Sequence, residues 1–319
     1  MLNKIITTCL YPVIEILPAT LAEKIKIIGC VIVGDWHFCN RAEEKNFISK
    51  ISIPEALEHF KGLDDNSLKN IEHYITYHKL MQSLLFPRRH IVNLDTKITI
   101  PSKAKRRLKK FHLEGYGVDS FSFRHGLDII NEEQKTYIKE KTFIDAGAYI
   151  GDSSLMFLEN GPKKIYAFEP FPSNIELFHK LMRQNEVPET MVELVPLGLS
   201  DAKSTIYSDD SFRCSNSPTN PGDTKIEVDT LDDFLKNRDD VIGFIKADIE
   251  GMGVRFLNGA KETILRDRPI VSLAIYHNQE EFFGGYDFFK SLGYKIKIEI
   301  FIPWHCEELT LFAIPEELT

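Results

Sequence analysis

The chain has 319 residues, 43% of them hydrophobic, and a formal net charge of −8. This length favours two domains, and the negative charge argues against nucleic acid or an anionic membrane surface as a partner. The five cysteines are scattered and contain no Cys-x-x-Cys pair, which argues against a disulfide framework and a zinc knuckle and favours a reduced, cytoplasmic protein.

Residues 1–115 are predicted to form a smaller α/β accessory domain. A buried strand is expected over residues 26–33, and apolar residues at helical spacing predict helix between Pro54 and Met81. The longest early uncharged run, residues 5–14, is too short to cross a membrane, so neither an integral membrane segment nor a secretion signal is expected.

The histidines of this region do not predict a metal centre. His73 and His78 are five residues apart and therefore lie off one helical face. Solvated or hydrogen-bonded histidines account for them, and our predicted site contains no metal.

A dense basic segment follows between Pro101 and Phe111, with six basic residues in eight positions. A charge run usually forms a solvated surface, so we interpret it first as an exposed link between the two domains. The alternative is a docking surface for a phosphate-bearing acceptor, such as a nucleotide-linked or lipid-linked sugar. Further along, Arg124 and His125 are expected near the mouth of the pocket of the second domain.

Residues 116–319 are predicted to form the larger domain, a Rossmann-like α/β fold with a sheet of about seven strands. Strands are expected at 142–144, 164–168, 192–197, 226–228, 243–247, 269–276, 294–301 and 309–314, with an antiparallel hairpin among the last three. Ser173 with Glu176, and Thr230 with Asp233, are interpreted as capping boxes at helix starts.

Residues 143–151, FIDAGAYIG, place an aspartate and two glycines where a strand turns into a helix. The strand ends at Asp145, and Gly147 and Gly151 have no side chain to block an approaching ligand. The next strand ends at Glu169, where a βαβ nucleotide fold places its ribose-binding carboxylate. This pattern suits S-adenosylmethionine; the alternative is a tight turn that needs glycine for packing alone.

A second group of polar residues follows a later buried strand. Lys246, Asp248 and Glu250 in IKADIEG come at its carboxyl end, the edge at which open α/β sheets bind ligands. The two acids are interpreted as a base for an acceptor hydroxyl, a contact to the methionine amino group, or ligands of a divalent cation; the alternative is capping of a helix expected over 254–265. His277 follows the next strand as a further base or as a merely hydrogen-bonded histidine.

Six segments resemble, in this order, the FkbM family of class I methyltransferases: FIDAGAYIGDSS, KIYAFEPFPSNIE, VPLGLSD, EVDTLDDFL, KADIEGMGVRFLNGA and SLAIYHN. The resemblance covers roughly the last 200 residues. It implies S-adenosylmethionine as cofactor and methyl transfer to oxygen, often a hydroxyl of a sugar or secondary metabolite, so the expected partner is a small-molecule or glycan acceptor. The resemblance also implies that Asp145, Gly147 and Gly151 lie at the methionine end of the cofactor. It places Glu169 on the ribose and Ser200 or Asp201 near the adenine.

The predicted site therefore has two parts. The residues predicted to bind the cofactor are Asp145, Gly147, Ala148, Tyr149, Gly151, Asp152, Glu169, Pro170, Ser200 and Asp201. The residues predicted to be catalytic are Asp248, Glu250 and His277.

One position departs from the family pattern. The family usually reads Asp-x-Glu-Gly-x-Glu, and the final acid is Gly253 here, so a carboxylate at the entry to the next helix is missing. This departure keeps open a non-catalytic scaffold or partner that retains the fold. A nicotinamide-dependent oxidoreductase is the other alternative, although Ala148 and Tyr149 replace the Gly-x-Gly-x-x-Gly rhythm that such enzymes usually carry.

Overall fold

The structure is a computed structural model that describes residues 46–82, 102–113, 124–208, 222–300 and 308–319. The chain divides into two compact units, residues 1–98 with 303–307 and residues 99–302 with 308–319. Among the described helices, none combines the length and the apolar character needed to cross a membrane.

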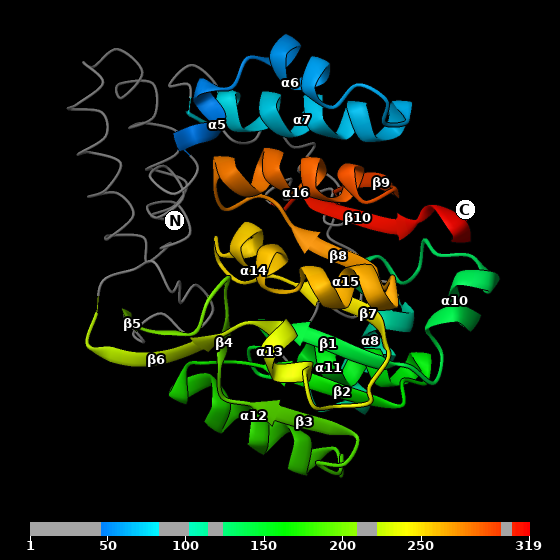
Figure 1. The fold of residues 1–319 in the computed structure, drawn as a ribbon, viewed down its shortest axis with the longest axis vertical. Helices are drawn as coiled ribbons and strands as arrows, with labels where there is room; N and C mark the ends of the chain where they lie inside the picture. Colours follow the sequence, from blue (N-terminus) through cyan, green and yellow to red (C-terminus); the bar gives the residue numbers. More distant parts are fainter. Residues whose placement is uncertain (1–45, 83–101, 114–123, 209–221, 301–307) are drawn as a thin grey trace, which may run out of the picture. The chain divides into compact units, whose positions relative to one another are not determined.

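The described part of the first unit consists of α5 Asn46–Lys50, α6 Ile53–His59 and α7 Asp65–Gln82 (Figure 1). Pro54 lies in the first turn of α6, where a missing N–H costs no helical hydrogen bond. Both short helices pack on α7, and Ala56, Phe60 and Ile71 are buried. The helical spacing was therefore read correctly, whereas the strand predicted at 26–33 lies outside the described residues.

The second unit is built on a seven-stranded sheet with the order β3-β2-β1-β7-β8-β10-β9. Its strands are β1 Thr142–Ala146, β2 Lys164–Phe168, β3 Val192–Val195, β7 Ile242–Ala247, β8 Ile270–Ala274, β9 Tyr294–Glu299 and β10 Thr310–Pro315. The first five in the spatial order run parallel, and β10 pairs antiparallel with β8 and β9. This arrangement confirms the Rossmann-like fold and the antiparallel hairpin near the end of the chain.

Helices cover both faces of this sheet (Figure 1). One face shares an apolar core, which includes Phe143 and Phe244, with α8 Ser102–Lys110, α10 Glu132–Ile138, α11 Asp152–Phe157 and α12 Pro172–Gln184. The opposite side carries α13 Leu231–Leu235, α14 Gly253–Gly259, α15 Lys261–Asp267 and α16 Gln279–Ser291. Three short 3₁₀ helices, η4 Arg124–Gly126, η5 Leu158–Asn160 and η6 Glu316–Leu318, complete the described elements. Because both faces are covered, every residue of β1 and β7 is buried.

A separate three-stranded sheet contains β4 Gly198–Leu199, β5 Ser204–Ser208 and β6 Thr224–Asp229 in the order β4-β6-β5. The strand predicted at 226–228 belongs to this sheet as part of β6, and the strand predicted at 192–197 ends two residues early, at Val195 in β3. The helix predicted over 254–265 breaks at Ala260 into α14 and α15.

One of the two predicted capping boxes is wrong. The first helical residue of α12 is Pro172, its N-cap is Phe171, and no side chain caps it. Proline is favoured at the first helical position, so this helix begins before Ser173 can act as its cap. Thr230 does cap α13, since its hydroxyl accepts a hydrogen bond from the N–H of Asp233 at 3.0 Å.

The basic segment is helix α8 and belongs to the second unit rather than forming an open link. Leu108 is buried in the core, and Arg107 forms an ion pair with Glu159, with Nη2 2.9 Å from Oε2. Lys109 and Lys110 are exposed on the other side of the helix. The segment is therefore an amphipathic helix with one packed face.

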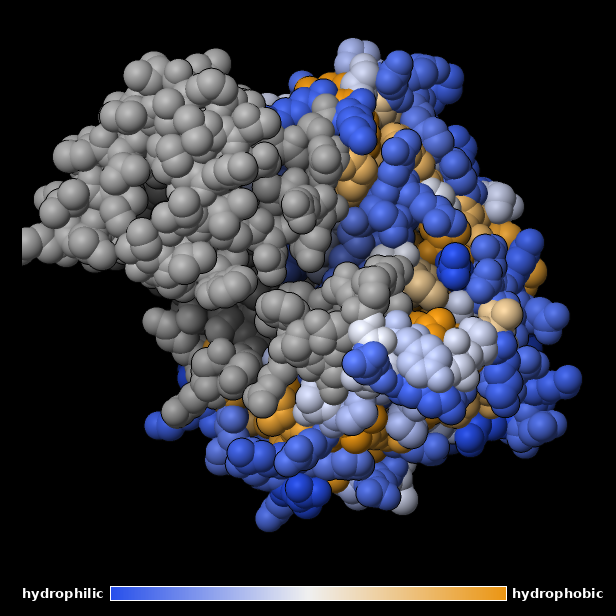
Figure 2. All heavy atoms as spheres, turned by 90° about the vertical axis from the view of Figure 1, so that its left-hand side faces the viewer, coloured by the Kyte–Doolittle hydropathy of each residue, from blue (hydrophilic) through white to orange (hydrophobic). Residues whose placement is uncertain are grey.

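The surface of the described residues is mainly hydrophilic on the face shown in Figure 2. The large apolar side chains that are exposed, among the described residues, are Ile129, Tyr207, Val241 and Leu265. They come from separate parts of the second unit, and single exposed apolar residues of this kind are normal on soluble domains.

Candidate functional site

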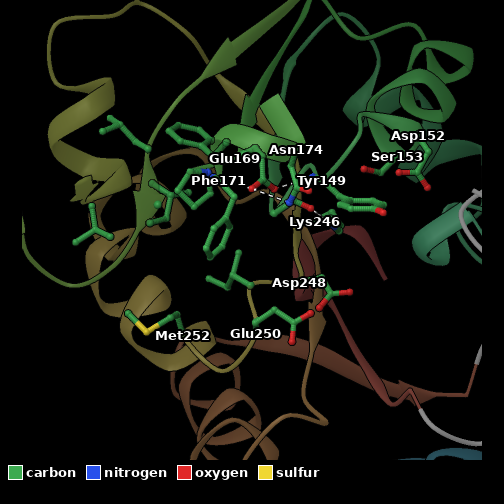
Figure 3. Close-up of a pocket in the computed structure, with 18 of the residues that line it drawn as sticks. Tyr149, Asp152, Ser153, Glu169, Phe171, Asn174, Lys246, Asp248, Glu250 and Met252 are labelled. Atoms are coloured by element: carbon green, nitrogen blue, oxygen red, sulfur yellow. Dashed lines mark hydrogen bonds between the residues drawn. The ribbon is translucent and has the colours of Figure 1, made fainter. Parts of the chain in front are cut away.

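The second unit has a pocket at the carboxyl ends of β1, β2 and β7 (Figure 3). From β1 the strand order runs to β2 and β3 on one side and to β7 and β8 on the other. At such a switch point of strand order, open α/β sheets have a crevice in which ligands bind. Seven predicted site residues line the pocket: Gly147, Tyr149, Asp152, Glu169, Pro170, Asp248 and Glu250. Six do not: Asp145, Ala148, Gly151, Ser200, Asp201 and His277.

Glu169 lies on one side of the pocket with Tyr149 and Asn174, while Asp248 and Glu250 lie on the other (Figure 3). Its Oε1 accepts hydrogen bonds from the N–H of Phe171 at 3.0 Å and from Nδ2 of Asn174 at 3.2 Å, and its Oε2 accepts one from the N–H of Tyr149 at 2.9 Å. A carboxylate oxygen has two lone pairs, so Oε1 is satisfied and Oε2 retains one acceptor position.

The side chain of Glu169 is almost completely buried. Burial raises its pKa to about 7, although the three hydrogen-bond donors and the charge of Lys246 act in the opposite direction. The carboxyl group therefore changes charge close to neutral pH.

The two glycines of the βα turn are required for different contacts. Gly147 has φ +77°, and a Cβ there would lie 1.9 Å from the carbonyl oxygen of Asp248, so the ends of β1 and β7 can meet only over glycine. Gly151 has φ +91°, and a Cβ there would lie 2.8 Å from Phe178 and 2.5 Å from Met182 on α12. Helix packing thus accounts for Gly151, as the alternative interpretation of the turn required, whereas Gly147 also lines the pocket.

Asp145 is fully buried behind the lining of the pocket and contacts residues that line it. Its Oδ2 accepts hydrogen bonds from the hydroxyls of Ser153 and Ser154, each at 2.6 Å, and its Oδ1 is 3.4 Å from Nζ of Lys246. These contacts join β1 to the first turn of α11 and to β7.

Lys246 lines the pocket and was given no role in the predicted site. Its Nζ donates to the carbonyl oxygen of Gly147 at 2.6 Å. Burial disfavours the charged ammonium, but the carboxylates of Asp145, Asp248 and Asp152 outweigh burial and raise the pKa of Lys246. The pocket therefore contains a fixed cation, the ammonium of Lys246. The sequence signal for this residue was its position two residues before Asp248, which places both side chains on the same side of an extended strand.

The region near Ser200 and Asp201 contributes apolar side chains instead. Ser200 is buried and donates to Asp201 at 3.0 Å, outside the lining of the pocket. Leu197, Leu199 and Val228 form the pocket wall there. An apolar group fits this wall better than a charged one.

Asp248, Glu250 and His277 are brought together at the other end of the pocket, from the adjacent strands β7 and β8. Nε2 of His277 is 3.3 Å from Oδ1 of Asp248 and 3.5 Å from Oε2 of Glu250. Glu250 has φ +52°, an uncommon backbone conformation for a residue with a side chain and one that clusters at functional sites. The three residues predicted to be catalytic therefore lie close together.

The opposite charges of this group stabilise one another. Burial favours neutral forms, but His277 and Lys246 outweigh burial at Asp248 and hold its pKa well below the ordinary value. Asp248, Glu281 and Glu250 likewise outweigh burial at His277 and hold its pKa well above the ordinary value. The group thus rests as an ionised carboxylate beside an imidazolium.

Among the residues that the structure describes, the same three form the group that could hold a metal ion. Their candidate ligand atoms all lie within 4.8 Å of one another, and carboxylate with imidazole is a common donor set for divalent cations. The divalent-cation interpretation of the two acids therefore stays open beside that of a base.

His125 also lines the pocket, close to where it was expected. Burial lowers its pKa to about 4, with the charge of Lys246 acting in the same direction, so its imidazole is neutral at neutral pH. Arg124 instead donates to Asp128 at 3.0 Å and to Asn160 at 3.1 Å.

Comparison with known families gives a match over residues 145–296 to the Methyltransferase FkbM domain. The chain carries an FkbM methyltransferase domain. The matched segment starts at the aspartate of β1 and ends in β9, so it contains both ends of the pocket.

Among solved structures, the chain is similar to the FkbM methyltransferase of Methylobacillus flagellatus KT, with 18% identity and a TM-score of 0.55 over 82% of this chain and 58% of that one. The chain thus spans less than two thirds of that protein. The chain also matches the putative methyltransferase SMU.1697c of Streptococcus mutans in complex with SAH, with 13% identity and a TM-score of 0.39 over 57% and 93% of the two chains. At such identities the first likeness shows the fold alone. No match to a curated protein was found.

The FkbM domain contains supporting residues that sequence reasoning missed. Asn174 holds Glu169, and Ser153 with Ser154 holds Asp145. Glu281 contacts both His277 and the first residue of α14. Asn174 and Ser153 lie close in sequence to their partners, and Glu281 lies four residues after His277. The contact between Glu281 and Gly253 has no recognisable spacing, because it joins two separate helices.

Proposed function

We propose that the FkbM domain binds S-adenosylmethionine in this pocket and transfers its methyl group to a hydroxyl of a sugar or another small molecule. The observation that carries the proposal is that the same pocket, at the switch point of the sheet, is lined by Glu169 at one end and by Asp248 and Glu250 at the other. The scattered cysteines suit a reducing compartment, so the cytoplasm is the proposed location.

The residues present fit this cofactor. Oε2 of Glu169 has one acceptor position left for a ribose hydroxyl. Leu199 and Val228 offer an apolar wall for adenine, in place of contacts from Ser200 or Asp201. The buried ammonium of Lys246 suits the carboxylate of the methionine moiety.

S-adenosylmethionine supplies a methyl group that is already activated on a sulfonium. The protein must then hold the acceptor oxygen in line with the methyl at about 3 Å, an effect that can supply roughly 7–11 kcal/mol. Asp248 and Glu250 line the pocket, and one of the two carboxylates would accept the hydrogen bond that the acceptor hydroxyl donates. Because the hydroxyl becomes strongly acidic as its oxygen is methylated, Asp248 would take up the hydroxyl proton even though its pKa is low. His277 contacts both acids and orients them without lining the pocket.

A thermal-shift comparison tests the cofactor class. S-adenosylhomocysteine at 100 times its dissociation constant should stabilise the protein by about 2.7 kcal/mol, whereas NAD and NADP should not. Stabilisation by a nicotinamide cofactor alone would favour the oxidoreductase.

Transfer is tested by incubating the protein and a metabolite extract with cofactor labelled in its methyl group. The expected result is label in an O-methyl group of a small molecule or glycan. Binding of S-adenosylhomocysteine without labelled product from any acceptor pool would favour the non-catalytic scaffold.

A further inference from the structure

Glu281, in the first turn of α16, is a buried acid outside the pocket. Its relative exposure is 1%, and Asn278 fixes its backbone by accepting from its N–H at 2.8 Å. Asn278 also donates to the carbonyl oxygen of Gly251 at 2.9 Å, so the start of α16 is tied to the loop after β7. The position of this carboxylate is therefore set by two elements.

Both oxygens of this carboxylate have a partner. Oε1 accepts from the N–H of Gly253 at 2.7 Å, and Oε2 is 2.9 Å from Nδ1 of His277. A carboxylate has no proton to give, so Nδ1 of His277 is the donor in this contact. Burial of an acid is tolerated when its oxygens are satisfied in this way.

Glycine at position 253 is what makes room for this acid. A Cβ built on Gly253 would lie 2.7 Å from Oε1 and 3.2 Å from both Cδ and Cγ of Glu281. α14 has no side-chain cap of its own, and the carboxylate of Glu281 satisfies its first N–H. Gly253 and Glu281 are thus complementary, and the carboxylate missing from the FkbM pattern at 253 is present from α16.

We propose that Glu281 is a positioning residue that takes the place of the acid absent at position 253. It accepts the hydrogen bond of Nδ1–H of His277 and so directs Nε2 of the ring toward Asp248 and Glu250, which are 3.3 and 3.5 Å away. The role in catalysis rests on the proposed function, but the control of the His277 ring does not.

The experiment compares Glu281→Gln, Glu281→Ala and the relocation variant Glu281→Ala with Gly253→Glu. Glu280→Gln is the matched control, because Glu280 is the exposed neighbour on the same helix turn. Nitrogen-15 spectra of the histidine rings report the protonation of Nδ1 in His277, assigned with a His277→Gln sample. Turnover and cofactor affinity are measured on the same samples.

Both Glu281 variants should shift the ring signals of His277, and Glu281→Ala should lower turnover by about tenfold to 10²-fold with cofactor affinity within about twofold. The relocation variant should restore the ring signals and much of the turnover, and Glu280→Gln should match the wild type. If Glu281→Ala does not fold, Glu281→Gln carries the same test.

Unchanged His277 ring signals in Glu281→Gln would overturn the proposal whether or not an acceptor has been found. A loss of turnover that only follows the loss of folded protein, with no recovery in the relocation variant, would also overturn it. Absence of methyl transfer in every sample, including the wild type, would instead refute the proposed function while the spectra still decide the role of Glu281.

Discussion

Glu169 is a buried carboxyl group that keeps one acceptor position open to the pocket. Replacing it by alanine removes this acceptor and releases the N–H groups of Tyr149 and Phe171 that it holds. Each charge-assisted hydrogen bond lost to the ribose should cost about 1.5–3 kcal/mol, so Glu169→Ala should weaken S-adenosylhomocysteine binding by roughly tenfold or more. Calorimetry checks this against Glu176→Ala, an exposed acid on α12. Equal affinities for the two variants would refute the ribose assignment.

The raised pKa of Glu169, about 7, gives cofactor binding a pH dependence. The ribose hydroxyls donate to the ionised form, which is the minority below pH 7 in the free protein. Affinity should therefore rise from pH 6 to pH 8, by up to about tenfold per unit below the pKa. Glu169→Gln should bind more weakly at pH 8 and lose this part of the dependence. The same slope in both proteins would exclude Glu169 as its source.

Asp248 is predicted to act on the acceptor rather than on the cofactor. Asp248→Asn keeps the size of the side chain but removes the carboxylate that takes the hydroxyl proton, so turnover should fall by about 10²–10⁴-fold while cofactor affinity changes little. Turnover that survives a chelator in the wild type would favour the base over a metal ligand. A variant that loses cofactor affinity and turnover equally would contradict the assignment.

At the scale of elements, the β1–α11 turn holds the site together through Gly147. A Cβ there would meet a backbone carbonyl of the neighbouring strand end, which cannot move as a side chain can. Gly147→Ala should therefore lower the free energy of unfolding by more than about 2 kcal/mol. Gly151→Ala meets the mobile end of Met182 and ring atoms of Phe178, so its cost should be smaller, about 1–3 kcal/mol. Urea unfolding of the two variants checks the order, and a milder effect at Gly147 would contradict it.

At the scale of the whole molecule, the sequence predicted the features that depend on local pattern. Apolar strand segments that alternate with helices predicted the sheet of the second unit. The polar residues that follow these strands predicted Glu169, Asp248 and His277 as site residues. The sequence could not give contacts that arise from packing between distant elements. Lys246 meets Asp145 across two strands, and Glu281 reaches Gly253 from another helix, with no spacing that marks either pair.

The same limit explains the predictions that missed. Strand propensity at 226–228 was correct, but propensity does not say which sheet a strand joins. Ser200 and Asp201 come directly after Leu199 in the chain, but it is Leu199, in β4, that lines the pocket. The sequence alone does not show which of these neighbouring residues faces the pocket. A capping box and a proline start compete at α12, and the proline determines where the helix begins.

A crystal structure of the protein with S-adenosylhomocysteine tests the central claim most directly. The predicted result places a ribose hydroxyl on Oε2 of Glu169, the adenine against Leu199, and the sulfur facing an opening lined by Asp248 and Glu250. A ligand bound outside this pocket, or one whose sulfur points away from both acids, would contradict it.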